Sequence, residues 1–266
     1  MTDSMSDFVA WLVWNVRGLN NPARCDAIYQ MVLLSGASVV CFQETKLQVV
    51  TRATVDRCLG QDFDEFFFLP AIGTCGGILL AWKSAVVSIS HPHYSANSLT
   101  ARVGDAGASG WWFTGVYGPQ SEADKRLFLQ ELKDVRDLHP GPWAVAGDFN
   151  LIVDAADKKN GNLNRRMMAK FRRVLAELDL KELYLNGRRY TWSNERERAT
   201  LERLDRVFTS VDWEVEFPAS FLSALSSSIS DHCPLLLNLA AQLRLGRRFR
   251  FETFWPNAEG FQDVVA

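Results

Sequence analysis

Short runs of almost wholly apolar residues constrain the fold of this chain most. Phe8–Trp14, Ser38–Phe42 and Trp143–Ala146 lack the apolar–polar alternation of a half-exposed strand. Apolar runs such as Gly36–Phe42 and Gly77–Trp82 are far too short to span a bilayer. Continuous runs of this length are typical of strands buried on both faces. The sequence therefore predicts sheets that other layers cover.

Helical segments fall between these strands. Pro22–Leu34 has apolar residues near helical spacing, and Met167–Leu178 has the same pattern. Ser121–Leu138 is the clearest amphipathic helix, with Ser121 as its expected N-cap and Asp124 completing a partial capping box. Its apolar positions are Phe128, Leu132, Val135 and Leu138. Further strands are expected at Phe66–Leu69, Gly77–Trp82, Ala85–Ser90, Trp111–Tyr117, Arg189–Ser193, Arg203–Thr209 and Leu235–Leu239.

Strands outnumber helices, and the helices lie between groups of strands. This order predicts an α+β fold, a four-layer α/β/β/α sandwich in which helices flank two packed mixed β-sheets. We expect one domain over residues 1–240. Beyond it, residues 241–266 form a basic and aromatic tail with no clear period, interpreted as a linker toward something absent. The sequence does not indicate an oligomeric state.

Composition narrows the class of protein. Of the 266 residues, 47% are hydrophobic, enough to bury a core. The polar, acidic start Met1–Asp7 lacks the features of a secretory signal, so we expect a nuclear or cytoplasmic protein. The five cysteines are scattered without a paired motif, which predicts reduced, mostly buried thiols rather than zinc ligands or disulfides.

Charge alone does not identify a nucleic-acid binder. The net charge is −2, whereas such proteins usually carry a basic excess. The basic residues are nevertheless clustered in Lys158–Arg173 and Arg244–Arg250. A local basic stretch can contact a phosphate backbone even when the whole chain is acidic. It can equally be a solvated helix face, and the sequence leaves this choice open.

Polar residues that directly follow apolar strands are the candidates for chemistry. Ends of strands hold side chains rigidly at one edge of a sheet, where active sites commonly form. Carboxylate and amide oxygens suit a hard cation such as Mg²⁺, and one imidazole beside them suggests hydrolysis of a phosphodiester. The residues concerned are Asn15, Glu44, Tyr117, Asp148, Asn150, Asp205, Asp231 and His232.

Each candidate also has a simpler interpretation. Asn15 could cap the following turn, Tyr117 could be a turn residue, and Asp148 with Asn150 could form an Asx turn. Glu44 could be a surface charge at the end of a strand. Asp205 could pair with a neighbouring arginine, either Arg203 or Arg206, and Asp231 with His232 could be an ordinary loop pair.

Taken together and in order, these motifs resemble the endonuclease/exonuclease/phosphatase superfamily, the DNase-I-like enzymes. The similarity runs from about Val9 to Leu239 and is strongest to the endonucleases of plant LINE-type retrotransposons. The superfamily motifs are Trp-Asn-Val-Arg-Gly-Leu at 14–19, Gln-Glu-Thr-Lys at 43–46, Val-Tyr-Gly-Pro at 116–119, Gly-Asp-Phe-Asn at 147–150, Leu-Asp-Arg-Val-Phe at 204–208 and Ser-Asp-His-Cys-Pro at 230–234. Tyr-Thr-Trp-Ser-Asn at 190–194 is similar to the plant LINE elements in particular.

The resemblance implies a metal-dependent phosphodiesterase that uses Mg²⁺, or Mn²⁺, and acts on DNA, with no membrane partner and no organic cofactor. Glu44 would hold the metal, with Asn15 close by and Asp231 as a further ligand. Asp148 would orient or deprotonate the attacking water. His232 would contact the scissile phosphate or act in acid–base catalysis, oriented by Asp231 or Asp205. Phosphate and substrate contacts would come from Tyr117, Asn150, Arg17, Thr191 and Ser230.

Arg17 departs from the superfamily pattern. It stands where some apurinic endonucleases carry an aspartate, so one metal contact would be lost and a cation gained. Arg17 could contact DNA or be held by a carboxylate. Trp192 could stack on DNA or, as is more common for tryptophan, fill the core.

Three functions are therefore compared. The first is a DNA endonuclease that nicks its target, the second a phosphatase or phosphodiesterase of small phosphoesters or RNA, and the third a catalytically silent binding domain derived from a retroelement. Intact Glu44, Asp148 and His232 disfavour the third. Because Glu44 and His232 are expected at a solvated rim, alanine at either should abolish turnover without unfolding the chain.

Overall fold

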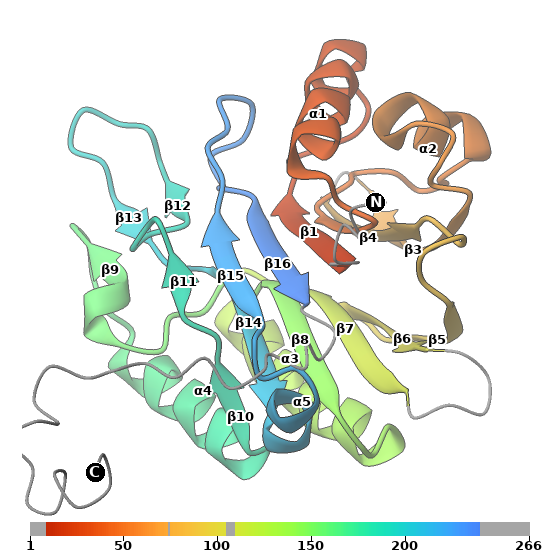
Figure 1. Ribbon diagram of the computed structural model, residues 1–266. Coiled ribbons are helices and arrows are strands. Elements are labelled where there is room, and N and C mark those ends of the chain that lie inside the picture. Colours follow the sequence, from red (N-terminus) through yellow and green to blue (C-terminus); the bar gives the residue numbers. More distant parts are fainter. Residues whose placement is uncertain (1–8, 74, 105–109, 240–266) are drawn as a thin grey trace, which may run out of the picture.

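The apolar strands form two mixed sheets. The computed structural model describes residues 9–73, 75–104 and 110–239 (Figure 1). The larger sheet has the order β11 (Leu185–Asn186), β15 (Phe221–Ala224), β16 (Leu235–Leu239), β1 (Val9–Asn15), β2 (Val39–Gln43), β4 (Cys75–Trp82) and β3 (Glu65–Ile72). The second has the order β10 (Leu180–Glu182), β14 (Asp205–Ser210), β8 (Trp143–Asp148), β7 (Trp111–Tyr117), β6 (Ser98–Val103) and β5 (Ile89–Tyr94). Short strands β12 (Trp192–Ser193), β13 (Leu201–Glu202) and β9 (Lys158–Lys159) form a third, small sheet.

Parallel pairing at the centre of each main sheet follows from helical crossovers. β1 and β2 are parallel and are joined by α1 (Pro22–Ser35); β7 and β8 are parallel and are joined by α3 (Glu122–Leu138). The Asn21 side chain caps the start of α1, where Pro22 needs no hydrogen-bond partner, and Gly36 ends the helix in the left-handed conformation. The two connections therefore bring the ends of β1, β2 and β8 to defined edges of their sheets.

Helices cover the outer faces of both sheets (Figure 1). α1 and α2 (Arg52–Leu59) bury Ile28 and Val55 against the outer face of β1 and β2. α3 and α4 (Arg165–Glu177) bury Phe128 and Phe171 against the outer face of the second sheet. A short helix, α5 (Val211–Glu216), and a 3-10 turn, Ala155–Asp157, complete the helices of the described residues. The predicted four-layer sandwich is confirmed.

The two inner faces pack directly on each other. Trp11 of β1 contacts the Phe113 ring of β7, with ring centroids 4.6 Å apart. Gly115 lies opposite Cys41, and a Cβ at Gly115 would come within 2.4 Å of the Cys41 Sγ. This position therefore admits only glycine without displacing a neighbour. Close packing between the sheets fixes the distance between side chains at their shared edges.

Several predicted elements have different bounds in the structure. Residues 85–88 are not in a strand, and β5 begins at Ile89 instead. Only Trp192–Ser193 of the expected strand Arg189–Ser193 is in a strand. Ser121 caps α3 and accepts from the Asp124 amide, as predicted. Leu138, however, is 60% exposed and lies outside the core.

All five cysteines are free thiols, and four of them are buried, with Cys75 exposed. Among the described residues, no helix is long and apolar enough to cross a membrane. The predicted tail, residues 241–266, lies outside the described residues, and so does the acidic start.

Candidate active site

The termini of five strands converge at one edge of the sandwich. Asn15 ends β1, and Glu44 follows the end of β2. Asp148 ends β8 and is paired in register with Asp205, the first residue of β14. His232 lies just before β16 and is bridged to Trp192. Residues from both main sheets thus meet at this edge, as the positions of the polar residues after strands predicted.

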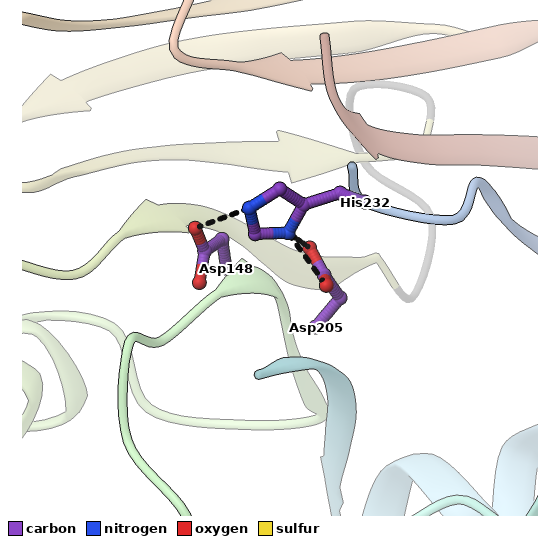
Figure 2. Close-up of side chains that lie close together, drawn as sticks. All are labelled: Asp148, Asp205 and His232. Atoms are coloured by element: carbon purple, nitrogen blue, oxygen red, sulfur yellow. Dashed lines mark hydrogen bonds and ion pairs between the residues drawn. The ribbon is translucent and has the colours of Figure 1, made fainter. Parts of the chain in front are cut away.

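The centre of the site is a buried chain of two carboxylates and an imidazole (Figure 2). The Nδ1 of His232 lies 2.9 Å from Oδ2 and 3.1 Å from Oδ1 of Asp205. The other ring nitrogen, Nε2, faces Oδ2 of Asp148 at 3.8 Å. One atom from each residue lies within 4.8 Å of the others, a spacing that could also hold a metal ion. The imidazole is therefore paired with Asp205 rather than with Asp231, and Asp205 is paired with His232 rather than with a neighbouring arginine.

Burial and the charges within the Asp148–His232–Asp205 cluster shift the pKa values of both Asp148 and His232. Burial opposes a charged imidazole, but the carboxylates of Asp205 and Asp148 raise the pKa of His232 to about 9. Burial raises the pKa of Asp148 to about 6, with the Asp205 charge acting in the same direction. At neutral pH the favoured state is therefore a protonated imidazole held between two carboxylates.

Two hydroxyl groups fix the backbone around the Asp148–His232–Asp205 cluster. Oγ1 of Thr191 accepts from the backbone amides of Leu204 and Asp205, each at 3.0 Å. Oγ of Ser230 donates to the Asn15 carbonyl at 2.8 Å and accepts from the His232 amide at 3.2 Å. The Thr191 hydroxyl is thus engaged within the protein, and Ser230 ties β1 to the segment that carries His232.

Two asparagines flank Asp148. The Asn15 amide donates to Oδ2 of Asp148 at 2.9 Å, while its own oxygen accepts from the Arg17 backbone amide at 3.1 Å. The backbone amide of Asn150 donates to Oδ1 of Asp148 at 2.9 Å, which is an Asx turn. Its side-chain amide donates to the Gly118 carbonyl at 2.7 Å. The simpler turn interpretations are therefore right for both asparagines, and these turns also place their side chains at the site.

Glu44 is buried and surrounded by cations. Its carboxylate pairs with Nη1 of Arg17 and with Nζ of Lys46, each at 3.1 Å. Arg17 also lies 3.1 Å from Oδ1 of Asp231, an ion pair without hydrogen-bond geometry. Burial opposes ionisation of Glu44, but Arg17 and Lys46 lower its pKa overall. Arg17 is thus held by two carboxylates, which was one of its two predicted interpretations.

Exposure differs from the expectation at several positions. Glu44 is only 5% exposed and His232 only 3%, so the expectation of a solvated rim is wrong for both. Tyr117 is partly buried, and burial together with the charges of Glu44 and Asp148 raises its pKa. Its hydroxyl therefore stays protonated and can donate to an anion.

Trp192 does not fill the core. Its indole Nε1 donates to Oδ2 of Asp231 at 2.8 Å, and its ring is partly exposed. With Tyr190 and Arg188 it lines a cavity of about 330 Å³ next to His232. Lys46 contacts Glu44, and the sequence analysis gave it no role. It belongs to the Gln-Glu-Thr-Lys motif two residues after Glu44, and that proximity was the available signal.

The chain was then compared with known proteins. Residues 12–232 match the model of the endonuclease/exonuclease/phosphatase family. The chain belongs to this family. Its members include hydrolases of phosphoester bonds, and the buried Asp148, Asp205 and His232 cluster lies within the matched region. No curated protein sequence matches the chain significantly.

Solved structures share the fold at low identity. An AP endonuclease from Leishmania major, LMAP, is 17% identical with a TM-score of 0.69, over 90% of this chain and 91% of that one. The endonuclease domain of TRAS1, a telomere-specific non-LTR retrotransposon, is 16% identical with a TM-score of 0.66, over 88% and 99%. TDP2 from D. rerio, complexed with a single-strand DNA product, is 17% identical with a TM-score of 0.60, over 87% and 98%.

The donor atoms suit a hard divalent cation of the kind associated with this family. Glu44 offers a buried carboxylate, and the oxygen of Asn15 accepts only one hydrogen bond, leaving a lone pair. The side chains of Arg17 and Lys46, which neutralise Glu44, are 41% and 29% exposed. Flexible, partly exposed cations can move away, so the residues present fit a metal at Glu44.

Proposed function

We propose that this family member is a metal-dependent DNA endonuclease that nicks its target by attack of water on a phosphodiester. The observation that carries the proposal is the buried Asp205–His232 pair facing Asp148, beside the carboxylate of Glu44. Two acid–base groups with opposite protonation states and an adjacent hard-cation donor are what hydrolysis of a phosphodiester requires.

Asp148 and His232 have different tasks. With a pKa of about 6, Asp148 is mostly ionised at neutral pH and can accept the proton of an attacking water. With a pKa of about 9, His232 is mostly protonated and can donate Nε2–H to a phosphate oxygen. The 3.8 Å between Nε2 and Asp148 is too long for a direct hydrogen bond and leaves this donor for an oxygen of the substrate or of water. Asp205 holds the proton at Nδ1 and so fixes the orientation of the ring.

Neutral and cationic donors would hold the phosphate. The side-chain amide of Asn150 lies 3.3 Å from Asp148, and Tyr117 is paired with Asp148 on the neighbouring strand β7; neither side chain carries a charge that would repel an anion. Such preorganised donors stabilise charge that develops on the phosphate in the transition state. A divalent cation at Glu44, with Asn15 and Asp231 as further oxygen donors, would supply neutralisation of phosphate charge and of the leaving oxygen. Thr191 and Ser230 would act through the backbones that they hold.

DNA is the substrate that we favour. TRAS1, which shares the fold, is a retrotransposon endonuclease, and the TDP2 structure contains a single-strand DNA product. The motifs around Arg17 and Trp192 are similar to those of LINE endonucleases, so we propose an element of that type or a free-standing relative. Arg165, Arg166, Arg172 and Arg173 are exposed on and near α4, where they could contact a backbone.

Nicking of supercoiled plasmid tests the proposal. We expect Mg²⁺-dependent nicking that EDTA abolishes, and a loss of about 100-fold or more in Glu44→Gln and in His232→Gln. These near-isosteric changes are chosen because both side chains are buried, so circular dichroism should show an intact fold. Lys181→Met, at the end of the second sheet remote from Asp205, is the matched control. If the folded wild type cleaves only small phosphodiesters, or nothing, the endonuclease proposal is wrong.

A further inference from the structure

A second polar pocket lies beside the site. It has a volume of about 190 Å³, and Asn150 is one of the residues that line it. The Asn150 oxygen accepts from the Gln120 amide at 2.9 Å, while the Asn150 amide faces Asp148 at 3.3 Å. These two side chains therefore connect the catalytic carboxylate with the pocket wall. The residues that matter for its chemistry are Gln120, Glu122, Lys125, Asn150, Lys158 and Glu202.

Among the charged side chains that line this pocket, all except Lys125 form ion pairs. Lys158 pairs with Glu202 at 2.8 Å, and Glu122 pairs with Arg126 outside the pocket, also at 2.8 Å. In the part of the chain that the structure describes, Lys125 makes no side-chain hydrogen bond and no ion pair. Its side chain is nonetheless partly buried. Lys125 is therefore the cation of this pocket without a carboxylate at ion-pair distance, although Glu202 and Asp148 lie near enough to attract it.

The position of Lys125 is unfavourable for stability. It lies in the first turn of α3, where the helix dipole favours anions and disfavours cations. Burial lowers the pKa of Lys125 despite the attraction of Glu202 and Asp148, and repulsion from Lys158 acts in the same direction as burial. An anion bound in the pocket would offset both effects, and the amides of Gln120 and Asn150 supply neutral polar groups next to it.

We propose that this pocket binds a second phosphate of the same nucleic-acid strand, next to the phosphate that Asn150 holds, with Lys125 as its cation. The inference rests on the proposed function and extends it. A substrate that continues past the cleaved phosphodiester would gain this contact, whereas a small ester with a single phosphate would not. The subsite therefore selects a polynucleotide.

The salt dependence of binding measures this contact directly. Each phosphate that a protein neutralises contributes about 0.9 to the slope of log affinity against log salt concentration for duplex DNA. We would measure binding of a fluorescent duplex oligonucleotide by anisotropy in EDTA, from low to moderate NaCl. Lys125→Met should reduce the magnitude of the slope by about 0.9 and weaken binding several-fold at low salt. Lys125→Arg should restore both values.

Controls separate the outcomes. Lys181→Met removes a charge remote from the site and should bind as the wild type does, and thermal melting should show that every variant folds. Lys125→Gln repeats the measurement with a polar side chain, in case methionine perturbs α3. If the Lys125 variants keep the wild-type slope and affinity, the subsite is wrong and the nuclease proposal stands. If the wild type shows no salt-dependent binding to DNA, the proposed function fails, and the subsite with it.

Discussion

His232 carries a positive charge in a setting that would ordinarily exclude one. The imidazole is 3% exposed, and only Asp205 and Asp148 make its charged form favourable. Removing one of these carboxylate charges should therefore shift the pH at which the His232 ring titrates. The shift should be measurable without any substrate.

The first prediction concerns stability and pH in EDTA. Because the pKa of His232 is raised from 6.5 to about 9 on folding, its contribution to stability is fully present below pH 6.5 and is lost as the pH rises through 9. Over the whole pH interval, the contribution of His232 to the free energy of unfolding amounts to roughly 3 kcal/mol. Urea unfolding of wild type and His232→Gln across this range should show the loss in the wild type alone. Parallel profiles for the two proteins would contradict the charged state of the ring.

The second prediction concerns Arg17 and the metal. Arg17 neutralises Glu44 and Asp231, so a divalent cation at Glu44 must compete with it. Arg17→Met should lower the Mg²⁺ concentration that half-saturates the protein several-fold, because the competing cation is gone. Thermal shift against Mg²⁺ checks this without activity. Lys125→Met, which leaves Glu44 untouched, is the control, and an unchanged midpoint for Arg17→Met would argue against a metal at Glu44.

Single residues of the site could be predicted from the sequence, but their pairing could not. The motifs singled out Asp148, Asp205 and His232, and the structure brings these three together. The sequence left both aspartates, Asp205 and Asp231, open as partners of the ring. That choice depends on the register of β14 against β8, which places Asp205 opposite Asp148, and no local pattern encodes it.

At the scale of elements, close contact between two loops positions Asn150, which we propose as a phosphate donor. Gly118, just after β7, packs against the backbone of Phe149, and its amide donates to the Asp148 carbonyl at 2.7 Å. A Cβ there would come within 2.0 Å of the Phe149 carbonyl oxygen. The position of Asn150 thus depends on Gly118 in the neighbouring loop, which has no side chain to clash with Phe149.

The third prediction follows from this contact. Gly118→Ala should lower the free energy of unfolding by about 1–3 kcal/mol, as overpacking does, and should reduce nicking by displacing Asn150. Urea unfolding and the plasmid assay measure the two effects. Gly73→Ala is a comparison, because its added Cβ would meet no atom within 4 Å, and its φ of +63°, unlike that of Gly118, is positive, so any effect there reports backbone strain alone. A Gly118→Ala protein with normal activity would show that the loop position is unimportant.

Elements in which apolar residues recur with a clear period were predicted well from the sequence, and short elements were not. The Ser121 cap and the apolar spacing located α3, whereas α2 has only Val55, Cys58 and Leu59 buried and gave no clear signal. The strands β9 to β13 are two or three residues long, below the length at which alternation can be seen. Tertiary pairing, rather than local preference, defines them.

At the scale of the whole molecule, the two sheets share one core. Trp11 lies at its centre, is fully buried, and contacts Phe113 and Trp111 of the opposite sheet. The fourth prediction is that Trp11→Ala costs about 3–5 kcal/mol. Far-ultraviolet dichroism and tryptophan fluorescence should still report one coincident transition. Leu138→Ala, at an exposed position, should change stability by no more than about 0.5 kcal/mol. Separate transitions would mean that the sheets unfold independently.

The first and last described strands are neighbours. β1 pairs with β16, so Val9 lies opposite Leu239, and His232 lies three residues before the start of that last described strand. During synthesis on a ribosome, Asn15 and Glu44 emerge early, but the imidazole emerges only after almost all of the sandwich. A nascent chain that ends before His232 holds its carboxylates without their acid partner. The order of the sequence thereby completes the Asp148, Asp205 and His232 cluster only when almost all of the described sandwich has been made.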